Sequence, residues 1–278
     1  MSDNTVLVLG ATGKTGRRVA TRLRMSGVGV RAASRSSDTR FDWSDPDTWD
    51  AALTGVAAVY IVPPDIIGPV DDFITNAERA GVRRVVLLSG RGADTWGDSA
   101  FGQDMIAAEK AVRSSELEWT IVRANNFAQN FTEDPLFVEA LAGGEVATPA
   151  GVVPEPFVDI EDVASVIVKA LTTEGHSGRT YELTGPRSIT FAEAVGLIAG
   201  ASDRTIDYRQ ISVSEYADAV ETTGWPRAAA EGVAAMYELM SRGLISTTTD
   251  DVAQVLGRPA TPFEDYVART ASAGGWRV

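Results

Sequence analysis

The sequence predicts an α/β fold in which a doubly wound parallel sheet is followed by a smaller, mostly helical C-terminal lobe. Three observations predict it. Short apolar runs alternate with helical segments over the first 125 residues, a glycine-rich turn follows the first run, and the chain is mostly helical from residue 191 onward. Strands that alternate with helices in this way form parallel βαβ units with helices on both faces of the sheet.

In the first half of the chain, strands are expected where apolar runs end at turn residues. Gly10 ends the first run, Pro63 and Pro64 stop a later one, and Gly81 stands just after a helix, where glycine is favoured. The sequence Ser-Asp-Pro-Asp at 44–47 predicts a further helix start. We expect strands at 5–9, 28–33, 40–42, 56–62, 82–89 and 119–123, and helices at 13–26, 70–80 and 100–114.

The pattern loosens after residue 130, where several prolines and a pair of glycines interrupt it. Residues 1–130 are therefore predicted to form one domain and 131–278 a second one, part of which returns to the main sheet. In the second part we expect strands at 157–160, 179–183 and 205–211, and a helix at 162–171.

Composition bounds the classes of protein to which the chain can belong. Hydrophobic residues make up 44% of its 278 residues, which is ample for a core, and no apolar run reaches the roughly 18 residues of a membrane span. The formal net charge is −13 and no basic stripe compensates it, which argues against binding to nucleic acid. There is no cysteine, and no cluster of ligands predicts a metal site. Because no basic leader precedes the first strand, a cytoplasmic location is expected.

The strand–turn–helix sequence VLVLGATGKTGRRVA predicts a dinucleotide-binding turn of Rossmann type. Gly10 permits a tight turn, Gly13 lets main-chain N–H groups approach a pyrophosphate, and Gly16 lets the helix pack against the strand. The N-terminus of the helix then presents its positive end to the phosphates. The other side chains expected beside the phosphates are those of Thr12, Lys14 and Thr15.

A rival interpretation takes Gly13-Lys14-Thr15 as the end of a P-loop, which would make the protein a nucleoside triphosphatase. That motif needs a glycine five residues before Gly13, where this chain has Val8 inside the strand. The P-loop interpretation therefore fails, and Lys14 is left as a residue beside the phosphates or in solvent.

The end of the second strand favours NADP(H) over NAD(H). NAD sites commonly place an acidic residue there to bind the ribose 2′-hydroxyl, whereas this chain has Arg35 and Ser36 and no acidic residue before Asp38. A guanidinium can bind a 2′-phosphate with two hydrogen bonds. The predicted cofactor is NADP(H), with NAD(H) as the alternative if Arg35 is an ordinary solvated arginine.

Together these segments resemble the NmrA-like branch of atypical short-chain dehydrogenases. That group includes quinone reductases, triphenylmethane dye reductases and proteins of ergot-alkaloid biosynthesis. The likeness extends from the first strand to about residue 260. It rests on GATGKTGRRV at 10–19, FDWSDPDTW at 41–49, GVRRVVLLSGRGA at 81–93, EWTIVRANNFAQNF at 118–131, PFVDIEDVA at 156–164 and GRTYELTGP at 178–186.

The resemblance implies where a dinucleotide would lie. The positions it implies, from the adenine through the ribose to the nicotinamide, are Asp42 and Trp43, then Val62 and Pro63, then Ser89 and Gly90. Trp43 is alternatively a core aromatic. Asn125 is expected to edge the nicotinamide pocket, and Ala124 stands where the family commonly has proline, which would reshape this loop.

The proton-transferring groups of related enzymes are not found at their usual spacing. Ordinary short-chain dehydrogenases use a Tyr-x-x-x-Lys pair, but Ile106 stands four residues before Lys110. Met105 stands where isoflavone-reductase-like relatives hold a catalytic lysine. We expect Lys110 to be a surface residue beside Glu109, and the only histidine, His176, to be a solvated turn residue. The catalytic groups, if any, stay unassigned.

The predicted function is an NAD(P)H-dependent oxidoreductase that transfers hydride to a conjugated aromatic, quinone or iminium acceptor, in secondary metabolism. Such acceptors take up hydride without prior protonation, so that orientation and exclusion of water suffice. Reduction of a quinone could be followed by reaction with dioxygen, which gives a net oxygenation. The residues expected to line the acceptor pocket are Trp96, Phe101, Asn125, Asn126, Phe127, Gln129, Asn130 and Phe131.

The sequence bears on two other functions. Some NmrA-like proteins are non-catalytic redox sensors that bind a dinucleotide and regulate partner proteins, and the missing catalytic pair suits that role as well. Nucleotide-sugar epimerase or dehydratase chemistry needs the Tyr-x-x-x-Lys pair and is disfavoured. The expected partner is a small aromatic or quinone-like molecule, and a homo-oligomer is compatible with the sequence.

Overall fold

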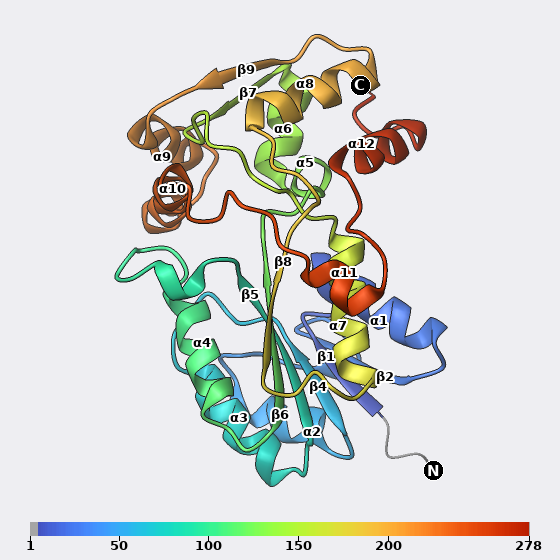
Figure 1. Ribbon diagram of the computed structural model, residues 1–278. Coiled ribbons are helices and arrows are strands. Elements are labelled where there is room, and N and C mark those ends of the chain that lie inside the picture. Colours follow the sequence, from blue (N-terminus) through green and yellow to red (C-terminus); the bar gives the residue numbers. More distant parts are fainter. Residues whose placement is uncertain (1–4, 278) are drawn as a thin grey trace.

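The computed structural model describes residues 5–277 and confirms the α/β fold (Figure 1). Its main sheet has seven parallel strands in the order β3-β2-β1-β4-β5-β6-β8. The strand order runs outward in both directions from the neighbours β1 and β4, and such a switch point is where α/β sheets bind ligands. The strands are β1 Thr5–Leu9, β2 Gly29–Ser34, β3 Thr39–Arg40, β4 Ala58–Ile61, β5 Arg84–Gly90, β6 Glu118–Ala124 and β8 Arg179–Leu183.

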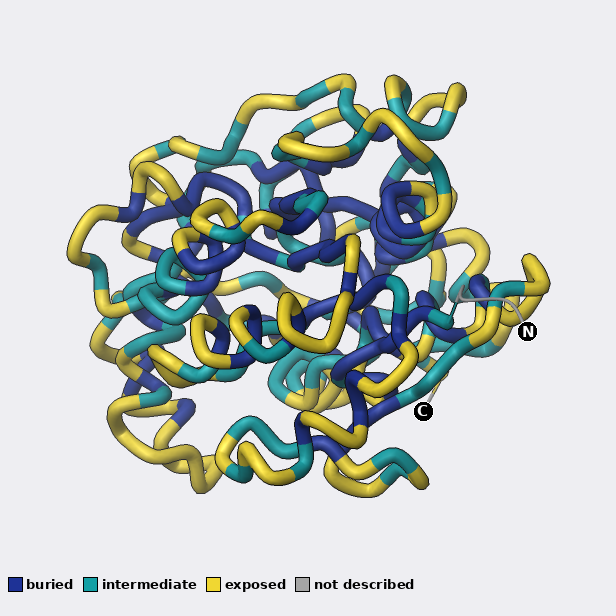
Figure 2. Tube along the Cα trace, turned by 90° about the horizontal axis from the view of Figure 1, so that it is seen from below, coloured by how far each residue is buried: buried dark blue, intermediate teal, exposed yellow. Residues whose placement is uncertain are grey.

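Helices cover both faces of the sheet (Figure 1). Alternate residues of β1 point to opposite faces: Leu7 packs in a core with α2, α3 and α4, whereas Val8 packs in a second core with α1, α7 and α11. Figure 2 shows the buried chain in the interior and the exposed residues mainly in peripheral turns. The bounds are α1 Lys14–Met25, η1 Pro46–Thr48, α2 Trp49–Leu53, α3 Pro69–Arg79, η2 Ala93–Thr95, α4 Gln103–Arg113, α7 Ile160–Thr172 and α11 Asp251–Leu256.

The remaining elements form a lobe at the carboxyl ends of the main strands (Figure 1). It has its own core, rich in phenylalanine and tyrosine, and a small parallel sheet of β7 and β9. Its elements are α5 Asn130–Glu133, α6 Pro135–Gly143, β7 Glu145–Thr148, α8 Phe191–Ser202, β9 Asp207–Gln210, α9 Val213–Thr222, α10 Arg227–Ser241 and α12 Phe263–Ser272. Within residues 5–277 we find no helix with the length and apolar character needed to cross a bilayer.

One expectation for the second half of the chain was wrong, and one strand was not predicted. The segment 157–160 is not a strand: Val158 forms a single bridge with Phe127, and α7 already begins at Ile160, where the Asp159 carboxylate caps it by accepting from the Glu161 amide. The strand β7 was not predicted. One strand of this half, β8, lies in the main sheet, where it pairs with β6.

Candidate functional site

The glycine-rich turn lies between β1 and α1 and has the close packing that its sequence predicts. Gly10 has a positive φ of 63°, and the Gly13 amide donates to the Gly10 carbonyl over 2.8 Å. A Cβ added to Gly16 would lie 2.2 Å from the Gly10 oxygen, so only glycine lets the helix start this close to the strand. The first amides of α1 have no intrahelical partner and stand at the exposed end of the turn, an arrangement that fits a diphosphate.

The two polar side chains at the start of α1 have different surroundings. The Thr15 hydroxyl is buried and accepts from the Tyr60 hydroxyl over 2.8 Å, so Thr15 can offer a ligand only its main chain. The Lys14 Nζ donates to Asn130 Oδ1 at 2.9 Å and lies 3.3 Å from the Asp134 carboxylate. Lys14 thus connects the turn to the loop that follows β6.

Beyond the end of β2, basic side chains gather at the surface. Arg35 and Ser36 are exposed, and the Asp42 carboxylate accepts from the amide and the hydroxyl of Ser44 at 3.0 and 2.7 Å. These hydrogen bonds, together with the charges of Arg35 and Arg40, hold the pKa of Asp42 below its ordinary value. The corner is therefore an exposed, arginine-containing surface that suits an anionic group.

Trp43 is half-buried at the edge of the core. Its ring packs edge-to-face against Phe41 and Phe73, with centroid distances of 5.0 and 5.3 Å. The indole thus packs against the core, as one of the two interpretations expected, and its contact with an adenine stays a prediction.

A cavity of about 320 Å³ opens above the carboxyl ends of β4, β5 and β6. Its wall is mainly apolar, and α10 of the lobe closes it from the opposite side. The buried Ser89 hydroxyl has no hydrogen-bond partner among the described residues, although buried hydroxyls usually have one. The lining residues that the sequence singled out are Lys14, Val62, Pro63, Ser89, Gly90, Trp96, Phe101, Ala124, Asn125, Asn126, Phe127 and Asn130.

Gln129 and Phe131, which the sequence also offered as lining residues, do not line this cavity. The Gln129 side chain is buried, donates to Asp159 Oδ1 at 2.7 Å and accepts from the Ile160 amide at 2.8 Å. Phe131 is buried in the core of the lobe. Both side chains thus help to hold the chain that follows β6 in place.

Two asparagines at the end of β6 are fixed by their neighbours. Asn125 donates to the carbonyls of Pro156 and Ile245 at 3.4 and 3.3 Å. Asn126 Nδ2 donates to Glu155 Oε2 at 3.4 Å, which leaves its carbonyl oxygen as the group it can offer to a ligand. Glu155 is fully buried and its Oε1 has no partner among the described residues; burial raises its pKa to about 8.

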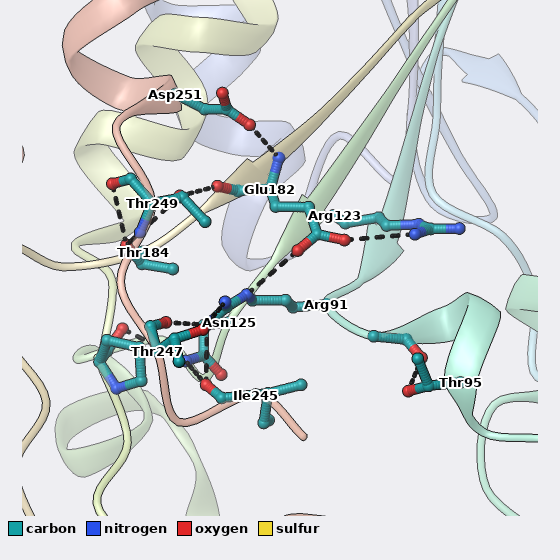
Figure 3. A network of polar contacts seen from close by, with 12 residues as sticks. Arg91, Thr95, Arg123, Asn125, Glu182, Thr184, Ile245, Thr247, Thr249 and Asp251 are labelled. Carbon is teal, nitrogen blue, oxygen red and sulfur yellow. Dashed lines mark hydrogen bonds and ion pairs between the residues drawn. The ribbon is translucent and has the colours of Figure 1, made fainter. Parts of the chain in front are cut away.

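The segment 244–251, which we call the strap, crosses the carboxyl ends of the strands and forms another wall of the cavity (Figure 3). The buried Arg91 guanidinium donates to the Ile245 carbonyl at 2.7 Å and to the Thr247 hydroxyl at 3.0 Å. Further along, the Thr249 amide donates to the Thr184 hydroxyl at 3.0 Å. These bonds tie the chain between α10 and α11 to the end of the main sheet.

Several cavity residues were not predicted as site residues, and most lie far along the chain from the glycine-rich turn. A pair such as Arg91 and Ile245 is separated by 154 residues, and no local pattern marks such a contact. The unpredicted lining residues are Asp65, Leu88, Arg91, Asp104, Met105, Met236, Leu239, Met240, Leu244 and Ile245.

Met105, Lys110 and His176 stand at or near positions that could bear on acid–base chemistry, and of these three only Met105 lines the cavity. Lys110 is exposed on α4. His176 contacts the Tyr181 hydroxyl at 2.9 Å and Thr173 Oγ1 at 3.1 Å, and burial lowers its pKa. Over residues 5–277, no three or more acidic or histidine side chains are grouped so that they could hold a metal ion.

The family and relatives that match this chain are named for NAD(P)H binding or for reduction, which agrees with the glycine-rich turn between β1 and α1. A family model described as NAD(P)H-binding matches residues 10–174. The chain is 32% identical to a (4-alkanoyl-5-oxo-2,5-dihydrofuran-3-yl)methyl phosphate reductase of Streptomyces griseus, over 96% of this chain and 98% of that protein. It is 29% identical to an NAD(P)H azoreductase of Xenophilus azovorans, over 97% and 99%. An NADPH complex of a quinone oxidoreductase from Escherichia coli has the same fold, with a TM-score of 0.82, 23% identity, and coverage of 95% and 99%.

Proposed function

Because the chain belongs to the NAD(P)H-binding family of oxidoreductases, we propose that it transfers hydride to a conjugated, electrophilic acceptor such as a quinone, an azo compound or an iminium ion. One observation carries the proposal. The cavity beside Ser89 and Gly90 has a mostly apolar wall, while the polar side chains in it are largely engaged with neighbouring protein groups. Such a site orients a flat acceptor and excludes water.

The described residues fit a dinucleotide that extends from the surface corner into the cavity. We propose that the first amides of α1 bind the diphosphate and that Arg35 and Ser36 bind a 2′-phosphate, which makes NADP(H) the preferred cofactor. The nicotinamide supplies or accepts a hydride when it is bound. The side chains proposed to contact the adenine, the ribose and the nicotinamide are Asp42, Trp43, Val62, Pro63, Ser89 and Asn125.

The proposed reaction needs no acid from the protein. Met105 occupies the cavity wall at the position where related reductases hold a catalytic lysine, and Lys110 points to solvent at the surface of α4. A simple ketone develops an alkoxide that has to be protonated, whereas a quinone or an iminium ion delocalises or neutralises the incoming charge. The relatives named azoreductase and quinone oxidoreductase support the choice of a conjugated acceptor.

Purified protein and NADPH, mixed with a panel of quinones, azo dyes and iminium ions, test the proposal. We expect loss of the reduced-nicotinamide absorbance with at least one of these acceptors and none with a simple aryl ketone. The assay is run with and without dioxygen, because NADPH oxidation beyond one equivalent of acceptor in air would indicate that the reduced product reacts with dioxygen. Tight NADPH binding without turnover of any acceptor would contradict the proposal and support a redox sensor.

A further inference from the structure

A second cavity, of about 160 Å³, lies inside the C-terminal lobe and meets the first. Asn126, Asn130 and Met236 line both cavities, so these three side chains lie between them. We call the larger space the acceptor cavity and the smaller one the lobe cavity. The two cavities are therefore adjacent and border the same three side chains.

Aromatic rings dominate the wall of the lobe cavity. They belong to the core of the lobe and hold one another in place: Phe137 stacks on Phe191 at an interplanar angle of 19°, and Tyr216 packs edge-to-face on Tyr237 with centroids 5.0 Å apart. Such a wall favours a flat ring, which can pack edge-to-face or stacked against it. The aromatic lining residues are Phe131, Phe137, Phe157, Phe191, Tyr216, Trp225 and Tyr237.

The volume of the lobe cavity and the charged group in its wall limit the kind of ligand that it can bind. An apolar protein cavity of about 150 Å³ is large enough to bind benzene, so 160 Å³ matches one six-membered ring. The acidic residue in the wall is Asp134, whose carboxylate already accepts from the Leu136 amide at 3.1 Å and lies 3.3 Å from Lys14 Nζ. Its charge is thus compensated within the protein, and the cavity suits an uncharged ring.

Hydrogen bonds hold the two polar side chains that line both cavities. Asn130 accepts from Lys14, and Asn126 donates to Glu155, so neither carboxamide is free to swing into the lobe cavity. Met236, on α10, forms part of the opposite wall, and its flexible thioether can adjust to the thickness of a ligand.

From these features we infer that the lobe cavity binds a planar, uncharged aromatic ring of the substrate while the electrophilic group of the same molecule lies in the acceptor cavity. The inference rests on the proposed function and makes it more specific. The substrate class is a polycyclic or aryl-linked acceptor, with at least one ring beyond the group that is reduced.

A plug in the lobe cavity tests the inference. Val233 lines the lobe cavity but not the acceptor cavity. Val233→Trp, which we call the plug, should therefore fill the lobe cavity and leave the acceptor cavity unchanged. The matched control is Glu238→Trp, which puts the same ring on an exposed position of α10. For the wild type, kcat/KM should rise from 1,4-benzoquinone to 9,10-phenanthrenequinone. The plug should lower kcat/KM for phenanthrenequinone by about 10- to 100-fold, with less than about a threefold effect on benzoquinone.

A binding measurement separates this inference from the proposed function. Trp225 lines the lobe cavity, so 2-naphthol, used as a ring that is not reduced, should quench its fluorescence, and Trp225→Phe should remove that quenching. The plug should abolish naphthol binding even if no acceptor is turned over, in which case only the proposed function fails. If quinones are reduced but the plug changes both quinones equally, or if naphthol does not bind, the lobe-cavity inference is overturned. Should Val233→Trp fail to fold, Val233→Phe gives the same comparison with a smaller plug.

Discussion

Replacing Glu155 by glutamine should make the protein more stable in alkaline solution. Glu155 is fully buried; one of its oxygens has no partner among residues 5–277, and the other accepts from Asn126. Burial raises its pKa from an ordinary 4.5 to about 8 in the folded protein. The glutamine side chain has nearly the same shape as the protonated acid and can still accept the hydrogen bond from Asn126, but it does not titrate.

The sign and size of the effect follow from proton binding. Between the two pKa values, the folded protein holds a proton on Glu155 that the unfolded chain has released, so the free energy of unfolding falls as the pH rises. The fall is about 1.4 kcal/mol for each pH unit. The stabilisation is fully present below pH 4.5 and is lost once the pH passes about 8. Glu155→Gln should therefore resemble the wild type at pH 5 and exceed its stability by about 3–5 kcal/mol at pH 9.

Urea unfolding of both proteins at several pH values between 5 and 9 measures this difference, because contributions of the other titrating groups are common to both and cancel. The matched control is Glu145→Gln, which changes an exposed glutamate on β7 and should leave the pH dependence unaltered. Parallel stability curves for the wild type and Glu155→Gln would refute the argument, since they would mean that Glu155 is ionised in the folded protein.

Three further predictions concern the cofactor turn and the strap. Arg35→Ala should weaken NADPH binding by about 10- to 100-fold and leave NADH almost unaffected, as calorimetry can show; equal losses would remove the 2′-phosphate assignment. Gly16→Ala forces a Cβ onto the Gly10 carbonyl and should weaken both dinucleotides and destabilise the fold, whereas Gly232→Ala on α10 meets no atom within 4 Å and should be neutral or slightly stabilising. Arg91→Lys keeps the positive charge but loses the two guanidinium nitrogens that donate to Ile245 and Thr247. It should lower the free energy of unfolding by about 2–4 kcal/mol. An unchanged unfolding midpoint would show that the strap is held by other contacts.

The sequence predicted the parts of the fold that depend on neighbouring residues. The glycine-rich turn, the alternation of strands and helices through β6, and the position of β8 along the chain all follow from short local patterns. The segment 157–160 was expected to be a strand because it is apolar, but Asp159 caps α7 at its end and stops any ladder after one bridge. The strand β7 has only four residues and pairs with β9, about 60 positions later, so no local pattern predicted it.

The two halves of the site also differ in how far the sequence predicted them, and this difference bears on the choice of acceptor. The proposed cofactor half is built from the turn at Gly10–Gly16 and the ends of β2, β4 and β5, all of which lie within the segment that matches the NAD(P)H-binding family. The opposite half comes from α10 and the strap, including Met236, Met240 and Ile245, beyond residue 174 where that match ends. Relatives can therefore keep the backbone that binds a dinucleotide and exchange the wall against which the acceptor lies. Differences in acceptor among these reductases should follow residues 225–245 more closely than residues 10–90, and exchanging that segment between two of them should transfer acceptor preference without altering NADPH affinity.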